Sequence, residues 1–209
     1  WQQLTRFWRD ACGTSVIAIT GSNGKTTVKE WLLQLIAPRT VAFGSPRSYN
    51  SQVGVPLALG ELHPDHQWGI VEAGISQPGE MDRLANCIAP NVGVLTHLGE
   101  AHLENFSDAA ALRTEKLRLF RGCSWVAMPG YLNEAADELR RQGIAVHTWG
   151  QGAEHDLKVT STPTDSKQTI ALEYDGEQTV WTLPFADEVG FRNAMTAALV
   201  GLVWGIPLG

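Results

Sequence analysis

The residues best suited to chemistry lie in one short segment, Gly21-Ser22-Asn23-Gly24-Lys25-Thr26-Thr27. Residues 16–19 form an apolar, β-branched run typical of a buried strand, and residues 26–36 place apolar side chains at helical spacing. The segment is therefore predicted to be a tight loop between a strand and a helix. Glycines let successive backbone N–H groups face one point, and the helix N-terminus adds partial positive charge there. This arrangement favours a phosphate group.

Two side chains extend the phosphate hypothesis. Lys25 is placed to reach the outer phosphates of a nucleotide, and the Thr26 hydroxyl is placed to ligate the accompanying Mg²⁺. The general phosphate-binding loop has another glycine five residues before Gly24, where this chain has Ile19. The loop is thus a variant, and a glycine-rich turn that opens an ordinary helix is the alternative. The sequence predicts a nucleoside triphosphate site.

Further polar groups follow other predicted strands. Glu72 ends the apolar run 68–71, and a carboxylate at the tip of a buried strand is costly unless it faces a cation or solvent. Because the strand beside a phosphate loop often ends in an acid that binds Mg²⁺, Glu72 is a predicted metal ligand. A solvated strand-end acid is the alternative. The polar loop 44–51 also follows a strand, where open α/β sheets hold ligands, although a plain surface loop explains it equally well.

The loop after the strand at residues 91–96 holds two histidines, His97 and His102, and two acids, Glu100 and Glu104. Imidazoles and carboxylates can ligate metals or transfer protons. A surface loop with ordinary histidines explains the same residues.

A lysine is predicted to point inward from the helix at residues 108–120, for which Asp108 is a candidate cap. Lys116 follows Leu112 by four residues and precedes Leu119 by three, so it lies on the apolar stripe. Such a lysine either extends its ammonium to solvent or has a lowered pKa, which would let it react or be modified.

The order of predicted elements indicates the fold class. Alternation of strands and helices over residues 15–149 predicts an α/β fold with a mainly parallel sheet and helices on both faces. Short alternating runs over residues 155–184 predict a small antiparallel sheet on the edge of the main one. A closing helix is predicted at residues 189–205. A leading helix is predicted from one apolar stripe, formed by Trp1, Leu4, Phe7, Trp8 and Ala11.

Composition excludes several classes of protein. The 209 residues suffice for one core and a small appended unit. The net charge of −6 argues against general nucleic-acid binding or a membrane-surface role. Three cysteines without metal-type pairing fit reduced thiols in the cytosol. Neither a transmembrane run nor a signal-peptide pattern is visible, so we expect a soluble, cytoplasmic protein.

Together, these motifs resemble the central, ATP-binding domain of the Mur ligase family. The resemblance covers essentially the whole chain and rests on the order and spacing of four blocks: residues 21–27, residues 72–81 (EAGISQPGEM), residues 101–106 (AHLENF) and residues 115–117 (EKL). Gly79-Glu80, Tyr49-Asn50-Ser51 and residues 102–106 are most similar to the members that add D-alanyl-D-alanine.

The resemblance implies an ATP-dependent amide ligation. The terminal carboxylate of UDP-MurNAc-tripeptide would take the γ-phosphoryl group to give an acyl phosphate, which the amine of D-Ala-D-Ala attacks with release of phosphate. The family also has an N-terminal domain that holds the UDP end of the substrate and a C-terminal ligase domain, both expected outside residues 1–209. Some bacterial relatives are fused to an alanine racemase.

The resemblance also implies roles for individual residues. Lys25 would hold the β/γ-phosphates, and Thr26 and Glu72 would ligate Mg²⁺. His102 would help to bind a second Mg²⁺. Lys116 matches the family lysine that CO₂ carbamylates, which turns a cation into a metal-binding carboxylate. The contacts implied for the remaining residues are adenine for Asn193 and the UDP-sugar substrate for Asn50 and Ser51.

The chain departs from the family pattern at two positions. Arg192 stands where the family commonly has a histidine that takes part in adenine binding, and His97 replaces a usual asparagine. Three alternative functions also stay open, and the first is that of another Mur ligase. Folylpolyglutamate synthase is similar in phosphate loop and mechanism, and the isolated fragment could be a nucleotide-binding module without ligase activity.

Overall fold

The computed structural model describes residues 2–99, 101–163 and 166–207. The strands form a nine-stranded sheet in the order β2-β3-β1-β4-β5-β6-β7-β8-β9. Their bounds are β1 (Ser15–Thr20), β2 (Ala42–Gly44), β3 (Trp68–Glu72), β4 (Val92–Leu95), β5 (Trp125–Pro129), β6 (Ala145–Gly150), β7 (Leu157–Pro163), β8 (Gln168–Tyr174) and β9 (Glu177–Leu183).

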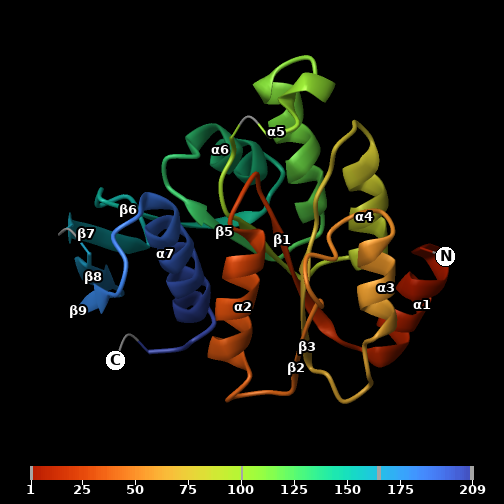
Figure 1. Cartoon of the computed structure of the whole chain (residues 1–209), viewed down its shortest axis with the longest axis horizontal. Coiled ribbons are helices and arrows are strands. Elements are labelled where there is room, and N and C mark those ends of the chain that lie inside the picture. Colours follow the sequence, from red (N-terminus) through yellow and green to blue (C-terminus); the bar gives the residue numbers. More distant parts are fainter. Residues whose placement is uncertain (1, 100, 164–165, 208–209) are drawn as a thin grey trace.

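Helices cover both faces of this sheet (Figure 1). Helices α2 and α7 lie together on one side, and α1, α3 and α4 lie together on the other. The bounds are α1 (Gln2–Cys12), α2 (Lys25–Ile36), α3 (Gly54–Gly60), α4 (Glu80–Ile88), α5 (Ala109–Leu117), α6 (Asn133–Arg141) and α7 (Glu188–Val203), with 3₁₀ turns at Leu103–Asn105 and Arg118–Phe120. None of the helices in the described ranges is both long and apolar enough to cross a bilayer.

Strand β1 shows why the sheet is buried on both faces. Val16 and Ala18 join the core cluster that includes residues of α3 and α4, whereas Ile17 and Ile19 join the cluster formed with α2 and α7. Successive side chains of a strand point to opposite faces, so an uninterrupted apolar run supplies both clusters. This central burial fixes the position of the loop that follows β1.

Strand β1 is also where the strand order reverses. It pairs in parallel with β3 on one side and with β4 on the other. In open α/β sheets, ligands bind beyond the carboxyl ends of the strands at such a reversal. The loops after β1, β3 and β4 therefore share the position at which a ligand is expected.

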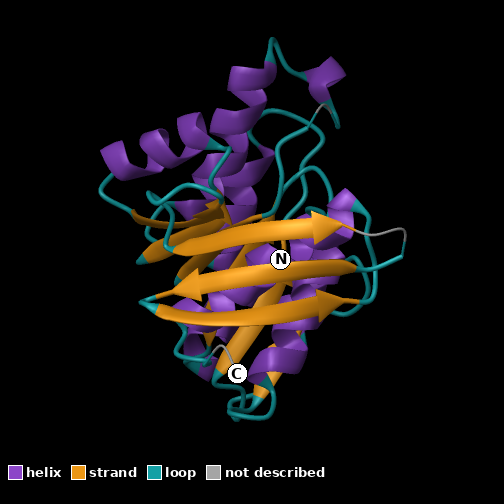
Figure 2. Cartoon of the chain, turned by 90° about the vertical axis from the view of Figure 1, so that its left-hand side faces the viewer, coloured by secondary structure: helices purple, strands orange, loops and turns teal. Residues whose placement is uncertain are grey.

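The last three strands confirm the predicted fold class and add a detail. Strands β7, β8 and β9 pair antiparallel with one another, as predicted. Figure 2 shows them side by side, facing the viewer. They continue the main sheet through a short parallel pair, in which Trp149 is aligned with Leu157 and Gly150 with Lys158.

Two local features differ from simple expectation. Helix α3 was not predicted; Pro56 is tolerated in its first turn, and the Gly54 N–H donates to Ser51 Oγ at 3.1 Å. The leading helix is confirmed, but its apolar stripe is largely exposed, with Leu4 60% and Phe7 71% accessible. Trp1, the first member of that stripe, lies outside the described residues.

The packing at Gly93 in β4 gives a test of the fold. A Cβ added there would lie 2.3 Å from Phe120 Cδ1 and 2.9 Å from Val126 Cγ2. We expect Gly93→Ala to lower the free energy of unfolding by about 1–3 kcal/mol, measured by urea denaturation, because the core is overpacked. Gly69→Ala in β3 is the matched control, since its nearest contacts are ordinary ones at 3.5 Å. Equal losses in both variants would contradict this packing.

Candidate functional site

The loop after β1 is fastened to the end of β4. Gly21 has a φ of 148°, and a Cβ added there would lie 2.1 Å from Thr96 Oγ1. Thr96 Oγ1 also donates to the Asn23 carbonyl at 2.5 Å, and the Ser22 N–H donates to the His97 carbonyl at 2.8 Å. Only a residue without a side chain fits at Gly21, and these contacts hold the loop in one shape.

The second glycine of the loop starts helix α2. Gly24 has a φ of 79°, which is costly for residues other than glycine, and it occupies the N-cap position. No side chain caps this helix at Gly24. The first N–H groups of α2 are therefore suited to an anion. Asn193 of α7 packs closely against Gly24, where an added Cβ would lie 2.1 Å from Asn193 Oδ1.

Lys25 lies folded over the loop. Its Nζ donates to the Gly21 carbonyl at 2.8 Å. Burial lowers the pKa of the Lys25 ammonium, and the Glu72 carboxylate partly opposes this change. An ammonium that is held beside the loop and poorly hydrated is suited to bind phosphate oxygens.

The carboxylate at the end of β3 meets the start of α2. The Glu72 side chain is 0% exposed. Its Oε2 accepts a hydrogen bond from Thr26 Oγ1 at 3.1 Å. Its Oε1 lies 3.1 Å from Lys29 Nζ and is buried without a hydrogen bond. The alternative of a solvated strand-end acid is therefore wrong.

Lys116 points inward, as predicted. The residue is 3% exposed, and its Nζ donates to Ser22 Oγ at 3.0 Å. Burial, and secondly the charge of Lys25, lower the pKa of Lys116 to about 8. The ammonium does not extend to solvent, so the structure favours the second sequence hypothesis, a lysine with a lowered pKa.

A cavity of about 270 Å³ opens beside the loop. Lys25, Lys116 and His102 line it, together with Asn50 and Ser51 from the loop after β2. Asn50 is fixed against the end of β3, because its carbonyl accepts from the Gly74 N–H at 2.7 Å. The structure thus brings side chains from four segments of the sequence to one space.

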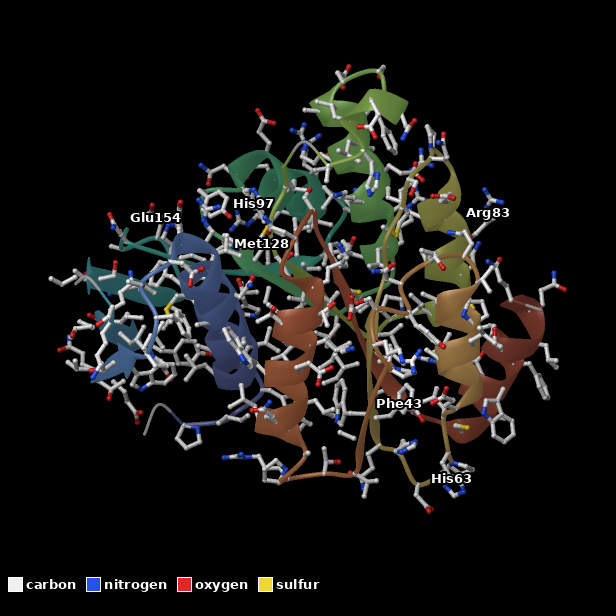
Figure 3. The ribbon with its side chains drawn as sticks, viewed as in Figure 1. Phe43, His63, Arg83, His97, Met128 and Glu154 are labelled. Carbon is white, nitrogen blue, oxygen red and sulfur yellow. The ribbon has the colours of Figure 1, made fainter. Side chains whose placement is uncertain are left out.

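The two histidines of the loop after β4 differ in their surroundings. His102 is exposed, has a left-handed φ of 68°, and faces the cavity. His97 lies instead near Tyr131, with Nδ1 3.0 Å from the phenol oxygen, and Figure 3 shows it in the upper part of the molecule, whereas His63 lies at the lower end. Glu100 lies outside the described residues.

Arg192 completes a separate cluster with His97 and Tyr131. Its guanidinium carbon lies 5.3 Å from the centre of the Tyr131 ring. Burial, then the charges of Arg192 and Lys116, lower the pKa of His97, and Glu188 partly opposes them. Arg192 is thus held by an aromatic ring and by its ion pair with Glu188.

The donor set near the loop fits a magnesium ion that arrives with phosphate. Within the described ranges, no three His, Cys, Asp or Glu side chains gather into a metal site. Thr26 and Glu72 together offer a hydroxyl and a carboxylate oxygen, because Oε2 of Glu72 lies 3.1 Å from Thr26 Oγ1 while Oε1 faces Lys29. Mg²⁺ is commonly held by one or two carboxylates, water and substrate phosphates, so these residues fit that ion.

Comparison with known proteins identifies the family. The Mur ligase middle domain matches residues 19–201. The chain belongs to the Mur ligase family. The chain is 25% identical over 205 residues to the UDP-N-acetylmuramoyl-tripeptide--D-alanyl-D-alanine ligase of Bacillus subtilis. It is 36% identical over 104 residues to the protein of the same name from Treponema pallidum.

Solved structures agree with this assignment. The crystal structure of MurF from Acinetobacter baumannii superposes with a TM-score of 0.87 at 26% identity, covering 99% of this chain and 47% of that one. MurF from Thermotoga maritima in complex with ADP has the same fold, with a TM-score of 0.87 at 20% identity, covering 100% of this chain and 49% of that one. The chain spans 45% of the Bacillus subtilis relative, which is about half its length.

Sequence reasoning missed Lys29, which is fully buried beside Glu72. The spacing of residues in α2 could have located it, because Lys29 follows Lys25 by four residues and precedes Leu32 by three, on the buried side of the helix. The same spacing argument located Lys116. Sequence reasoning also missed Thr96, which fastens the loop after β1 through its hydrogen bond to the Asn23 carbonyl. This contact joins the ends of two strands, and no local sequence pattern indicates it.

The contact between Gly24 and Asn193 gives a test of the site geometry. We expect Gly24→Ala to lower the free energy of unfolding by at least about 1–2 kcal/mol for the left-handed backbone, plus a cost for overpacking Asn193. Adding Asn193→Ala should relieve the second cost, so the double variant loses less than the sum of the single losses in urea denaturation.

The control for this test is Gly122→Ala. Gly122 has a similar φ of 87°, but an added Cβ there meets nothing within 4 Å. This variant measures the backbone cost alone. Additive losses for Gly24→Ala and Asn193→Ala would show that the two residues are not in contact.

Proposed function

We propose that the chain is the central, nucleotide-binding domain of a bacterial cytoplasmic ligase that joins D-Ala-D-Ala to UDP-MurNAc-tripeptide, with ATP converted to ADP and phosphate. The observation that carries the proposal is the cavity at the phosphate loop, where Lys25, Lys116 and His102 meet Asn50 and Ser51. The names of the relatives supply the substrate class. The UDP-binding and C-terminal domains are proposed to belong to the complete protein.

The phosphate loop would hold the triphosphate. The N–H groups of the first turn of α2, at residues 25–27, would face the phosphates, and Lys25 would exchange its bond to the Gly21 carbonyl for the β/γ-phosphate oxygens. Thr26 and Glu72 would hold Mg²⁺, which neutralises phosphate charge. Asn193, packed on Gly24, is placed at the edge of this site, where we propose that it contacts adenine.

The cavity would position the two groups that react. A carboxylate and a phosphate repel one another, and Lys25, which lines the cavity, would supply positive charge beside them. Asn50 and Ser51 would contact the sugar-linked substrate. The carboxylate would take the γ-phosphoryl group of ATP to give an acyl phosphate, with release of ADP. The amine of D-Ala-D-Ala would then attack the acyl carbon, so that the C–N bond forms, the C–O bond to phosphate breaks, and phosphate leaves. His102 would help to hold a second Mg²⁺ at the exposed side.

Lys116 is proposed to be carbamylated. The neutral amine attacks CO₂, an N–C bond forms, and one N–H proton passes to solvent. A lysine of ordinary pKa is almost wholly protonated at neutral pH. Lys116, with a pKa lowered to about 8, has far more of the reactive form.

The reaction is tested on the complete protein that contains this chain. UDP-MurNAc-tripeptide with D-Ala-D-Ala should give ATP-dependent phosphate release and an amide product. Tetrahydrofolate with glutamate should give none. The reverse result would favour a folylpolyglutamate synthase, whose solved structure shares the fold with a TM-score of 0.70 at 15% identity.

Nucleotide binding by the 209-residue chain is a separate prediction. We expect weak ATP binding with Mg²⁺ and no amide formation, because a site without a closing domain leaves ATP in water. Lys25→Met should weaken the affinity by about tenfold to a hundredfold, the value of a charge-assisted hydrogen bond, measured by titration calorimetry.

The matched control is Lys158→Met, which removes a lysine paired with Glu173 in the antiparallel strands. It should bind ATP as the native chain does. Robust amide formation by the 209 residues alone, or equal ATP affinity for Lys25→Met and the native chain, would contradict this prediction.

Carbamylation of Lys116 predicts a pH dependence. For a pKa of about 8, about half of the amine is neutral at pH 8 and about 1% at pH 6. With ¹³C-bicarbonate, we expect a carbamate signal in ¹³C NMR that grows between these pH values. In Lys116→Met, the intensity of the carbamate signal should fall by the contribution of one lysine. In Lys158→Met, the intensity should equal that of the native chain. Equal carbamate in the native chain and Lys116→Met would exclude this modification.

A further inference from the structure

Lys29 is a buried charge that the proposed reaction does not use. It lies one turn after Lys25 on α2, and its side chain is 0% exposed. Its Nζ donates to the carbonyls of Ser45 at 2.7 Å and Arg47 at 2.6 Å. It also lies 3.1 Å from a carboxylate oxygen of Glu72. One ammonium therefore contacts the loop after β2 and the end of β3.

This arrangement is not explained by stability alone. Taking an ammonium and a carboxylate out of water is costly, and well-packed apolar residues often replace a buried ion pair without loss of stability. A second acid, Glu30, lies 3.1 Å from the same Nζ, but its side chain is half exposed. The contacts to Glu72 and to the backbone of the 45–47 segment are the buried ones, and both lead to the candidate site.

The contact to Glu72 fixes the direction of the carboxylate. Lys29 attracts Oε1, so Oε2 is the oxygen that meets Thr26 Oγ1 at 3.1 Å. Without the ammonium, the buried Oε1 would lose its nearby positive charge. The carboxylate could then turn away from Thr26.

The contacts to the loop fix a second group. Arg47 has a left-handed φ of 51°, an uncommon conformation for a residue with a side chain, and Lys29 binds its carbonyl. Ser48 follows, with its Oγ 3.3 Å from Thr26 Oγ1. Asn50 and Ser51, which line the cavity, come two and three residues later.

We propose that Lys29 is a positioning residue: it orients Glu72 toward the metal bound with the nucleotide and ties the loop of residues 45–51 to the phosphate-binding helix. The inference rests on the proposed function, because it concerns the same site. It assigns no contact between Lys29 and substrate.

The test is the Mg²⁺ dependence of ADP binding to the 209-residue chain. Residues that orient a metal ligand typically change metal affinity by about 10–100-fold when removed. We therefore expect Lys29→Met to raise the Mg²⁺ concentration for half-maximal ADP binding by about tenfold or more. ADP affinity in EDTA should stay within about twofold of native. Lys158→Met is the matched control and should change neither value.

A double variant separates positioning from simple packing. In the Glu72→Gln background, adding Lys29→Met should shift the Mg²⁺ dependence no further, because the lysine acts through the carboxylate. If Lys29→Met alone does not fold, Lys29→Gln takes its place in both comparisons, since its amide can still donate to the two carbonyls but carries no charge to attract Glu72.

The outcomes distinguish this inference from the proposed function. A native chain that binds no ADP with Mg²⁺ would overturn the proposed function and the inference with it. A native chain that binds Mg²⁺-dependently while Lys29→Met keeps the native Mg²⁺ requirement would overturn the inference alone. A further large shift in the Glu72→Gln background would also overturn it.

Discussion

The site depends on the close approach of backbone at Gly21 and Gly24. At Gly21 the loop lies against Thr96 of the neighbouring strand end, and at Gly24 it lies against Asn193 of α7. Neither position has room for a Cβ. Because both neighbours belong to buried elements, the loop has one shape and its N–H groups have one direction, which suits an anion that must be held in a defined orientation.

Charge around this loop differs from charge over the whole chain. The protein has a net charge of −6, yet Lys25 and Lys29 both interact with the buried carboxylate of Glu72, and Lys116 lies near enough to Lys25 to be repelled by it. Burial lowers the pKa of Lys25 and of Lys116, and the charge of Lys25 lowers that of Lys116 further. A bound triphosphate, or a carbamate on Lys116, would supply negative charge, so the region is arranged for anions before any ligand binds.

The three lysines near the loop have different contacts, because two lie at successive turns of α2 and the third lies on α5. Lys25 is at the first turn of α2, and its Nζ donates to the Gly21 carbonyl. Lys29, one turn later, is held by two carbonyls and a carboxylate. Lys116 comes from α5 and reaches the loop from the other side through Ser22. The same residue type thus has three different sets of contacts.

By itself, the sequence determined the phosphate loop, the α/β fold class, Glu72 at a strand end and the inward direction of Lys116, because these depend on local spacing and periodicity. Only the tertiary structure decided that Asn50 and Asn193 reach the loop, that Thr96 fastens it, and that Lys29 faces Glu72. Helix α3 and the exposed face of α1 were also decided at that level. These contacts join residues far apart in the chain, and their geometry depends on how strands pair across the sheet, which no local pattern records.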